Sequence, residues 1–335
     1  GPRGSRLCLA LARALHDGVQ HHAFWLAHEM DSGSVTLIRF AGGRGASSPH
    51  PEPSVTSLID SLGEVDPERA STAMVLEALQ ESVDSARYWQ PADGSDVLTQ
   101  LPEVHDALAP IASAIEARAD TAWWREGRRA AQWAIDWCDP DDLAPVGDDP
   151  TDALTEWTDH TRAEEARSTE RRAADPTALW SGEWWSFPPG ALRTTGELPD
   201  GTPAGLPFIE DSLGWQSATA IPVRGDGRTY EIRGADDWVT LCRRHPLEVS
   251  ASRRDDWRNA TGRTGRWVIP DWQRVARELD AVHLTTTAYL AAATKDIPVY
   301  DDASSVIAGW GPDTTLWLRG ISSRDERADV PWRRD

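Results

Sequence analysis

The segment from Tyr230 to Trp317 constrains the fold more than any other part of the chain, because strand-like and helix-like stretches follow one another within it. RWVIP, AVHLTT and SSVIAGW have the composition of short strands, and GPD turns the chain into another, TTLWL. Helix-like stretches with capping residues lie between them. Strands and helices that follow one another without strict alternation indicate a compact α+β module.

Local signals place three further elements in this region. The glycines of Gly225–Gly227 separate the strand-like stretches TAIPV and TYEIR, which predicts a β-hairpin. Asp236 is placed to cap a helix that runs through Arg244 and ends before Pro246. Asp271 is placed to cap a second helix over WQRVAREL.

The first half of the chain is mainly helical in pattern. Residues 6–30 predict a helix interrupted at Gly18, residues 34–40 alternate like a strand, and residues 42–54 are rich in Gly, Pro and Ser and predict a loop. From residue 54 to about 172 the pattern is again helical. We therefore predict an α+β protein in which a mainly helical N-terminal half precedes a compact, mixed split-sheet module. One predicted apolar helix face consists of Val104, Leu108, Ile111 and Ile115.

The length of 335 residues favours more than one domain. We expect an N-terminal helix and strand over residues 1–50, an acidic and mainly helical domain over 51–174, and an α+β domain over 175–325 that would hold a nucleotide-binding or catalytic site. The last boundary lies where the helical pattern gives way to short strands. The first five residues, GPRGS, resemble a cloning remnant rather than part of the fold.

Charge is concentrated in the middle of the chain. Residues 51–200 contain 31 acidic and 11 basic residues, a difference of −20, which equals the net charge of the whole chain. Such a field disfavours nucleic acid and anionic membranes as partners, and leaves a basic protein partner as a candidate. No apolar run approaches the roughly 20 residues of a membrane span. Three well-separated cysteines without a CxxC pair favour a reduced, cytoplasmic setting.

Arginine is concentrated locally against this acidic background. Nine arginines lie in Arg243–Arg277 against four acidic residues, which predicts a site for a nucleotide or another anionic small molecule. Arg253 and Arg254 would hold a pyrophosphate, with the adjacent aspartates orienting them. Arg193 and Thr194, after a turn, would bind a phosphate or a ribose. The alternatives are a solvated surface turn and a lattice of salt bridges.

Ten of the eighteen tryptophans lie between Trp180 and Trp317. Trp238 and Trp272 fall on apolar helix faces and are expected in the core. Trp215 and Trp257 neighbour polar or turn residues, where an indole offers a flat stacking surface for a planar ring such as adenine or nicotinamide.

His283 is the candidate acid or base. In AVHLTT the period of two sets His283 and Thr285 on the face opposite two apolar residues, towards a cleft or solvent, where a histidine can bind a hydroxyl or transfer a proton. A hydrogen-bonded structural histidine is the alternative. Asp280, at the start of the same strand, and Glu231, in TYEIR, are the candidate carboxylates. Tyr289 would stack or donate a hydroxyl.

Signatures of other chemistries are absent from the sequence. His21, His22 and His28 lie close together but lack the spacing of known zinc motifs, so no metal is expected. No GxSxG of a serine hydrolase is present, and no GxGxxG opens a helix after a strand.

The order TYEIRGADDW, IPDWQRVARELDAVHLT and GWGPDTTLWL resembles the C-terminal part of bacterial ADP-ribosyltransferase-like proteins, over roughly Trp180 to Gly320. The resemblance implies a split-sheet α+β fold, NAD⁺ as substrate, an arginine or histidine that grips it, and aromatic stacking on the nicotinamide. It places Arg193 early in the fold and Tyr230 on a middle strand. His283 stands where such proteins often carry a glutamate.

A histidine cannot supply the negative charge that stabilises an oxocarbenium-like transition state. Glu231, Asp280 or Asp313 would then take over that role, or the module would bind without transferring. The leading hypothesis is an intracellular enzyme for NAD⁺-dependent ADP-ribosyl transfer or NAD⁺ hydrolysis. The alternatives are a non-catalytic interaction or scaffold protein with an acidic helical surface, and a tailoring enzyme of bacterial secondary metabolism with a Trp-lined pocket.

Overall fold

The computed structural model describes residues 1–31, 53–137, 146–211 and 215–333. These residues form two compact units, an all-helical one from Pro2–Ser82 and Pro91–Thr121, and one that holds both sheets, from Gly1, Val83–Gln90 and Ala122–Asp335. The predicted α+β class with a helical N-terminal half is thereby confirmed. The domain limits predicted at residues 50 and 174 stay predictions, and the predicted strand at 34–40 lies outside the described residues.

The helical unit is built from amphipathic helices, and the four apolar residues predicted on one face of α6 are all buried. One boundary differs from the prediction: the first helix breaks at His16 and not at Gly18, because the His16 ring caps α2 by accepting a hydrogen bond from the Val19 amide (3.4 Å). The elements are α1 (Pro2–Leu15), α2 (Asp17–Met30), α3 (Val55–Gly63), η1 (Pro67–Arg69), most of α4 (Thr72–Asp84), α5 (Gly94–Gln100) and α6 (Pro102–Ala117).

The first residues belong to the fold, contrary to the expectation of a cloning remnant. Arg3 is 1% exposed, donates a hydrogen bond to the Ser82 carbonyl (3.0 Å) and pairs with Asp96. Arg6 donates to Asp93 at 2.7 Å. These contacts neutralise two buried guanidinium groups of α1.

The second unit contains a large sheet in the order β11-β3-β1-β2-β10-β7-β4, with β12 also paired to β3. Its pairs are antiparallel except β4 with β7. A second sheet has the order β5-β6-β9-β8. The strands are β1 (Ala131–Asp136), β2 (Arg193–Thr195), β3 (Ser217–Gly225), β4 (Thr229–Ile232), β5 (Pro246–Glu248), β6 (Arg266–Pro270), β7 (Ala281–Leu284), β8 (Ile297–Pro298), β9 (Ala303–Ser305), β10 (Thr314–Trp317), β11 (Ser322–Arg324) and β12 (Val330–Arg333).

The predicted hairpin between β3 and β4 is wrong. The two strands lie far apart in the sheet order, and β4 pairs with β7 instead. The glycines between them serve close packing: a Cβ on Gly225 would come within 2.3 Å of the Trp317 ring, and one on Gly227 within 2.3 Å of Ile321. The two glycines are therefore explained by the close packing of Trp317 and Ile321 against the backbone, and not by a hairpin turn.

Register divides the large sheet into two faces, because residues directly opposite each other share a face. Trp133, Thr195 and Thr314 are successive partners across β1, β2 and β10 and define one face. The opposite face carries a polar row that runs from Thr194 through Thr315 and His283 to Glu231.

Helices of this unit begin and end largely where the sequence places them. α8 ends at Arg244 as predicted, although Gly234 occupies its N-cap position and Asp236 lies in its first turn. Asp271 caps α10 by accepting from the Arg274 amide (3.1 Å), but this helix has only four residues. The helices are η2 (Ala119–Arg125), which begins in the helical unit, α7 (Thr151–Ala174), α8 (Ala235–Arg244), α9 (Arg254–Thr261), α10 (Trp272–Val275) and α11 (Thr286–Ala292).

Trp238 and Trp272 are fully buried, which confirms their predicted place in the core. Together with Trp310 they form a cluster with ring centroids 5.6–6.2 Å apart. Each indole N–H donates a hydrogen bond. The Trp238 indole donates to Ser305 Oγ. The Trp272 indole donates to the Ser186 carbonyl and the Trp310 indole to Ser186 Oγ. The polar edge of each of these three rings is therefore satisfied.

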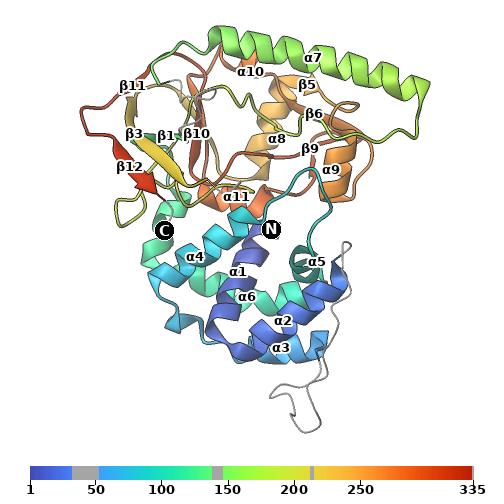
Figure 1. The fold of residues 1–335 in the computed structure, drawn as a ribbon, viewed down its shortest axis with the longest axis vertical. Helices are drawn as coiled ribbons and strands as arrows, with labels where there is room; N and C mark the ends of the chain where they lie inside the picture. Colours follow the sequence, from blue (N-terminus) through green and yellow to red (C-terminus); the bar gives the residue numbers. More distant parts are fainter. Residues whose placement is uncertain (32–52, 138–145, 212–214, 334–335) are drawn as a thin grey trace. The chain divides into compact units, whose positions relative to one another are not determined.

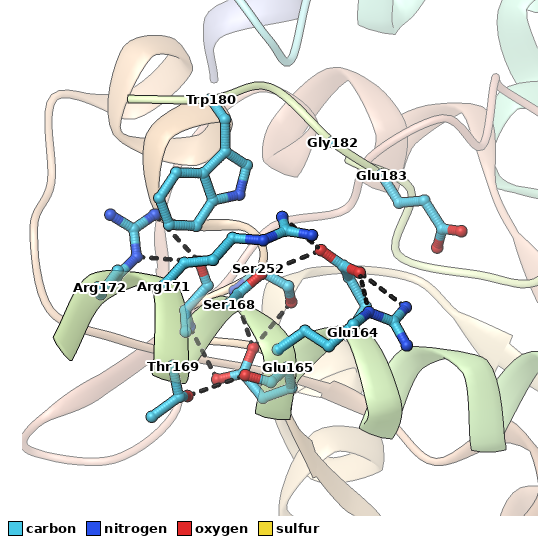
Figure 2. A network of polar contacts seen from close by, with 12 residues as sticks. Glu164, Glu165, Ser168, Thr169, Arg171, Arg172, Trp180, Gly182, Glu183 and Ser252 are labelled. Atoms are coloured by element: carbon cyan, nitrogen blue, oxygen red, sulfur yellow. Dashed lines mark hydrogen bonds and ion pairs between the residues drawn. The ribbon is translucent and has the colours of Figure 1, made fainter. Parts of the chain in front are cut away.

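α7 is a long helix that is seen uninterrupted in Figure 1 and packs beside α10, to which Arg162 is tied through Asp271 (2.7 Å). It is unusually polar, and hydrogen bonds rather than a broad apolar face attach it. Figure 2 shows Glu165 facing Ser252, and the Glu165 carboxylate accepts from the Ala251 amide (2.7 Å) and from the Ser252 amide and hydroxyl (both 2.8 Å). None of the described helices combines the length and the apolarity that a membrane crossing requires.

Replacing Glu165 by alanine is expected to lower the free energy of unfolding by about 2–3 kcal/mol, because two backbone N–H groups of buried residues lose their acceptor. Urea unfolding followed by circular dichroism measures the loss. Glu170→Ala, at an exposed position of the same helix, is the matched control and should change stability by less than about 0.5 kcal/mol. Equal losses in both variants would contradict this function of Glu165.

Candidate functional site

A cleft of about 540 Å³ opens on the Trp133 face of the large sheet, within the range of volumes typical of small-molecule sites. We call it the indole-lined cleft. Its lining combines aromatic rings with polar and small residues. The aromatic residues are Trp133, Trp137, Trp184, Trp185, Phe208, Trp215 and Trp310.

Strand geometry builds the floor of the cleft. Trp133 and Ile135 alternate along β1, and Trp137 follows just after the strand ends, so that all three share one face. Thr195 and Thr314, on β2 and β10, continue the same face and also line the cleft. The cleft therefore rests on three paired strands, β1, β2 and β10.

Two pairs of indoles line the cleft. Trp137 and Trp215 stack with ring centroids 5.6 Å apart, and Trp184 and Trp185 lie 4.8 Å apart. Gly309 makes room for the second pair: its φ is +83°, and a Cβ there would lie 2.6 Å from Trp185 Cδ1. Only glycine fits this position without displacing the rings.

The charged groups of the lining are Arg193, Glu210 and Asp211. Arg193 is exposed, and its guanidinium lies over the Phe187 ring at 5.1 Å. Asp211 forms an ion pair with Arg87 at 3.1 Å. The lining thus carries one guanidinium and two carboxylates, and one of these carboxylates belongs to this ion pair.

Glu210 is held in place by two tyrosines from distant parts of the chain. Its Oε1 accepts hydrogen bonds from the hydroxyls of Tyr88 (2.6 Å) and Tyr289 (2.8 Å), and both tyrosines are fully buried. Sequence reasoning missed Glu210, since nothing in the surrounding LPFIEDSLGW marks it. Only the fold shows that Tyr88 and Tyr289 both donate hydrogen bonds to Glu210.

Of the residues predicted to bind a cofactor, the structure brings Arg193, Thr194 and Trp215 to this cleft. The Thr194 hydroxyl, however, belongs to the opposite face of the sheet, where it donates to Gln132 (2.6 Å) and accepts from the Trp317 indole (2.8 Å). The prediction that this hydroxyl grips a ligand is therefore corrected, because the strand alternation directs it away from the cleft.

Arg253, Arg254 and Trp257 do not line the cleft. Trp257 is fully buried, and its indole donates to the Trp184 carbonyl at 3.0 Å, so it has no free face for stacking. Arg253 is also fully buried, 3.3 Å from Glu183, and burial lowers the pKa of its guanidinium while Glu183 opposes that shift.

The predicted pyrophosphate site is corrected as well, because carboxylates already occupy its surroundings. Asp255 and Asp256 accept hydrogen bonds from the amides of Trp180 (3.2 Å) and Gly182 (3.0 Å) instead of orienting arginines toward a ligand. The Arg172 guanidinium lies 4.0 Å over the Trp180 ring, and Figure 2 shows these two residues side by side. Arg172 also pairs with Asp255 at 3.1 Å.

The two predicted tyrosines have different environments. The Tyr230 hydroxyl donates to the Asp237 carbonyl at 2.9 Å, and burial raises its pKa. Tyr289 does donate its hydroxyl, as one of its two predicted functions required, but to Glu210. Neither ring is part of the cleft lining, and the buried Tyr289 acts on the cleft through the carboxylate that it orients.

His283 and Glu231 do come together, as neighbours on β7 and β4, with His283 Nε2 4.0 Å from Glu231 Oε2. His283 is nevertheless fully buried and does not face a cleft or solvent; its Nδ1 lies 3.0 Å from the Thr315 hydroxyl. Thr285 is not its companion either, because β7 ends at Leu284 and Thr285 caps α11. The alternative of a hydrogen-bonded structural histidine describes these contacts.

The second carboxylate beside His283 is Asp313, whose Oδ1 lies 3.6 Å from Nε2. Asp313 is held by Arg129 (3.2 Å) and the Gly196 amide (2.8 Å), with a φ of +55° in the turn before β10. Asp280 lies apart from this cluster and accepts from the Arg228 amide at 2.8 Å. Burial raises the pKa of Asp313 to about 6 and that of Glu231 above its usual value.

Among the described residues, no group of three or more His, Cys, Asp or Glu side chains is arranged to hold a metal ion. No family model matches the chain, and comparison with curated proteins and with solved structures gives no match.

Proposed function

We propose that the indole-lined cleft binds a small planar molecule that carries an anionic group, and that NAD⁺ or a related nucleotide is the first candidate. The observation that carries this proposal is the meeting of seven aromatic rings and the Arg193 guanidinium around one cleft of about 540 Å³. Rings of this kind stack on a base or a nicotinamide, and a guanidinium binds phosphate oxygens in pairs.

The reaction implied by the resemblance is ADP-ribosyl transfer or hydrolysis at the nicotinamide ribosyl bond. In this reaction nicotinamide leaves with the bonding electron pair, positive charge develops on the ribose, and water or another nucleophile attacks the same carbon. A carboxylate facing the ribose stabilises that charge. Within the cleft lining Glu210 supports this function better than Glu231, whose strand neighbours direct it to the opposite face of the sheet.

A second candidate function, also a proposal, is the binding or modification of an uncharged aromatic metabolite. The seven aromatic rings of the lining favour it, because apolar pockets with few charged groups suit such ligands. The two candidates differ in their dependence on Arg193.

Replacing Arg193 by glutamine is expected to weaken ADP-ribose binding by about 10-fold or more, since a charge-assisted hydrogen bond contributes about 1.5–3 kcal/mol. Trp215→Ala should weaken it several-fold through the loss of one stacking ring. Isothermal titration calorimetry with NAD⁺, ADP-ribose and AMP measures both effects. Arg254→Gln, which removes the same charge outside the cleft, is the control and should leave affinity unchanged.

Failure of all three nucleotides to bind the wild type at millimolar concentration would overturn the nucleotide proposal. Binding that Arg193→Gln leaves intact would overturn the assignment of the phosphate to this cleft. Binding of uncharged aromatic compounds with no nucleotide binding would favour the second candidate.

A further inference from the structure

We infer that the turn Gly309–Asp313, with the sequence GWGPD, is an anion-binding turn of the indole-lined cleft. The donors are the backbone amides of Trp310 and Gly311, and the ligand group is a phosphate or a carboxylate. We call this segment the glycine turn. The inference rests on the proposed function and deepens it, because it names the groups that hold the anionic end of a ligand in the same cleft.

The backbone of the glycine turn alternates in hand. Its first, third and fifth residues have positive φ angles, +83° at Gly309, +68° at Gly311 and +55° at Asp313. The residues between them, Trp310 and Pro312, have φ angles of the ordinary negative sign. Alternation of this kind turns neighbouring backbone N–H groups toward one concave side, and such concave arrangements of N–H groups bind anions.

Two amides of this turn are left without a protein partner. Among the residues that the structure describes, none accepts a hydrogen bond from the amide of Trp310 or of Gly311. Both residues are buried, and both line the cleft together with Gly309. Backbone N–H groups of buried residues are nearly always hydrogen-bonded. These two amides are therefore available to an acceptor that enters the cleft.

Side chains of the glycine turn hold it in place. The Trp310 indole donates to Ser186 Oγ at 3.1 Å. The Asp313 carboxylate accepts from the Gly196 amide at 2.8 Å and pairs with Arg129 at 3.2 Å, and it lies outside the cleft lining. Donors that are fixed before a charge arrives need no reorganisation, which strengthens their effect on that charge.

An aromatic face lies next to the glycine turn. Gly309 packs against Trp185, since a Cβ at this glycine would come within 2.6 Å of the Trp185 ring. Two neighbouring N–H groups match two oxygens of one group, as phosphate and carboxylate both provide. A flat ring that carries such a group fits this combination, because the ring stacks on an indole while the oxygens accept from the two amides.

The test removes one donor without changing a side chain. Replacing Gly311 by glycolic acid in cell-free translation converts its amide into an ester, which has no N–H. AMP and nicotinate are the anionic probes, and adenosine and nicotinamide are their neutral counterparts. In calorimetric titrations of the full chain, the ester variant should bind AMP, nicotinate or both about 10-fold more weakly than the wild type, as expected for one hydrogen bond to a charged group.

The neutral probes should bind the wild type and the ester variant equally. A loss for AMP alone assigns the turn to phosphate, and a loss for nicotinate alone assigns it to a carboxylate. Gly147 provides the matched control, because it also has a positive φ (+91°) and lies outside the cleft lining. The same replacement at Gly147 should leave every affinity unchanged.

A measurement on the wild type covers the case in which the ester variant does not fold. Trp310–Gly311 is the single Trp–Gly pair in the sequence, so ¹³C-carbonyl tryptophan with ¹⁵N-glycine labels the Gly311 amide uniquely in an NMR spectrum. Its proton should shift downfield when an anionic probe is bound, because donation to an anionic oxygen deshields it. The neutral counterpart should leave the signal in place.

Equal binding of both anions by the wild type and the ester variant would overturn the inference, as would failure of both anions to bind the wild type. Failure of the inference is distinguishable from failure of the proposed function. Nucleotide binding that Arg193→Gln weakens and the ester variant leaves intact keeps the proposed function and removes the inference. Nicotinate binding that the ester variant weakens, without nucleotide binding, keeps the inference and removes the nucleotide.

Discussion

Trp272→Ala is expected to lower the free energy of unfolding of the sheet-containing unit by about 3–5 kcal/mol, the range for a large aromatic side chain removed from a packed core. Trp272 exposes none of its surface and contacts the rings of Trp238 and Trp310 at 6.2 and 5.6 Å. Its removal leaves a cavity beside two rigid indoles and frees the Ser186 carbonyl that its N–H holds at 2.9 Å.

Urea unfolding followed by circular dichroism measures this loss. Trp180→Ala is the matched control, because Trp180 is partly exposed and packs on Arg172, a contact worth about 0.5–1 kcal/mol. Similar losses in the two variants would contradict the central position of the tryptophan cluster. A smaller loss in Trp272→Phe than in Trp272→Ala would show that ring volume is the main contribution.

The pH dependence of the free energy of unfolding is expected to reflect the shifted pKa values of His283 and Asp313, which are buried side by side. Burial lowers the pKa of His283 to about 3, and the neighbouring guanidinium groups of Arg128, Arg129 and Arg233 add to that effect. Burial raises the pKa of Asp313 to about 6, although Arg129 and the Gly196 amide oppose the shift.

The two groups act in opposite directions. As the pH falls below the ordinary histidine value of 6.5, the unfolded state takes up a proton that folded His283 refuses until about pH 3, so stability falls over this window. Folded Asp313 takes up its proton near pH 6, before the unfolded chain does near 3.8, so stability rises between these values. In the wild type the two contributions largely cancel between pH 6 and 4.

Single substitutions should separate the two contributions. Relative to the wild type, His283→Gln should gain stability on acidification from pH 6.5 to 4, on the order of 1 kcal/mol per pH unit. Asp313→Asn should lose a similar amount between pH 6 and 4. Urea titrations at several pH values measure both slopes, with Asp301→Asn, at an exposed position, as the control. Parallel pH profiles for the wild type and both variants would contradict the buried pair.

Local sequence patterns predicted those helices and strands whose limits depend only on residues a few positions away. The end of α8 at Arg244 and the strand β6 follow from a proline and from β-branched and aromatic residues within a few positions. The burial of Trp238 and Trp272 follows from the apolar face of a helix, which a period of 3.6 residues fixes without reference to the rest of the chain.

Pairing and burial could not be predicted in the same way. The Gly225–Gly227 segment looked like a hairpin turn, but β4 pairs with β7, some fifty residues later in the chain. The run of Arg253 to Trp257 was interpreted as a pyrophosphate site, with a solvated turn or a lattice of salt bridges as alternatives. The fold buries Arg253 and Trp257 and places carboxylates around the Arg253 guanidinium. The partner of β4 and the burial of Arg253 depend on residues far away in the sequence, so the local pattern could not decide between the alternatives.

The sequence by itself thus determined the α+β class, most of the elements, and the residue types available for binding, because these depend on periodicity and composition. Only the tertiary structure decided which of those residues share a cleft. Arg193 and Trp215 meet there with Glu210, and Tyr88 and Tyr289 reach Glu210 from positions about 120 residues before it and 80 after it. The physical reason is that a binding site depends on distances across the fold, which are set by the pairing of strands and the packing of the core.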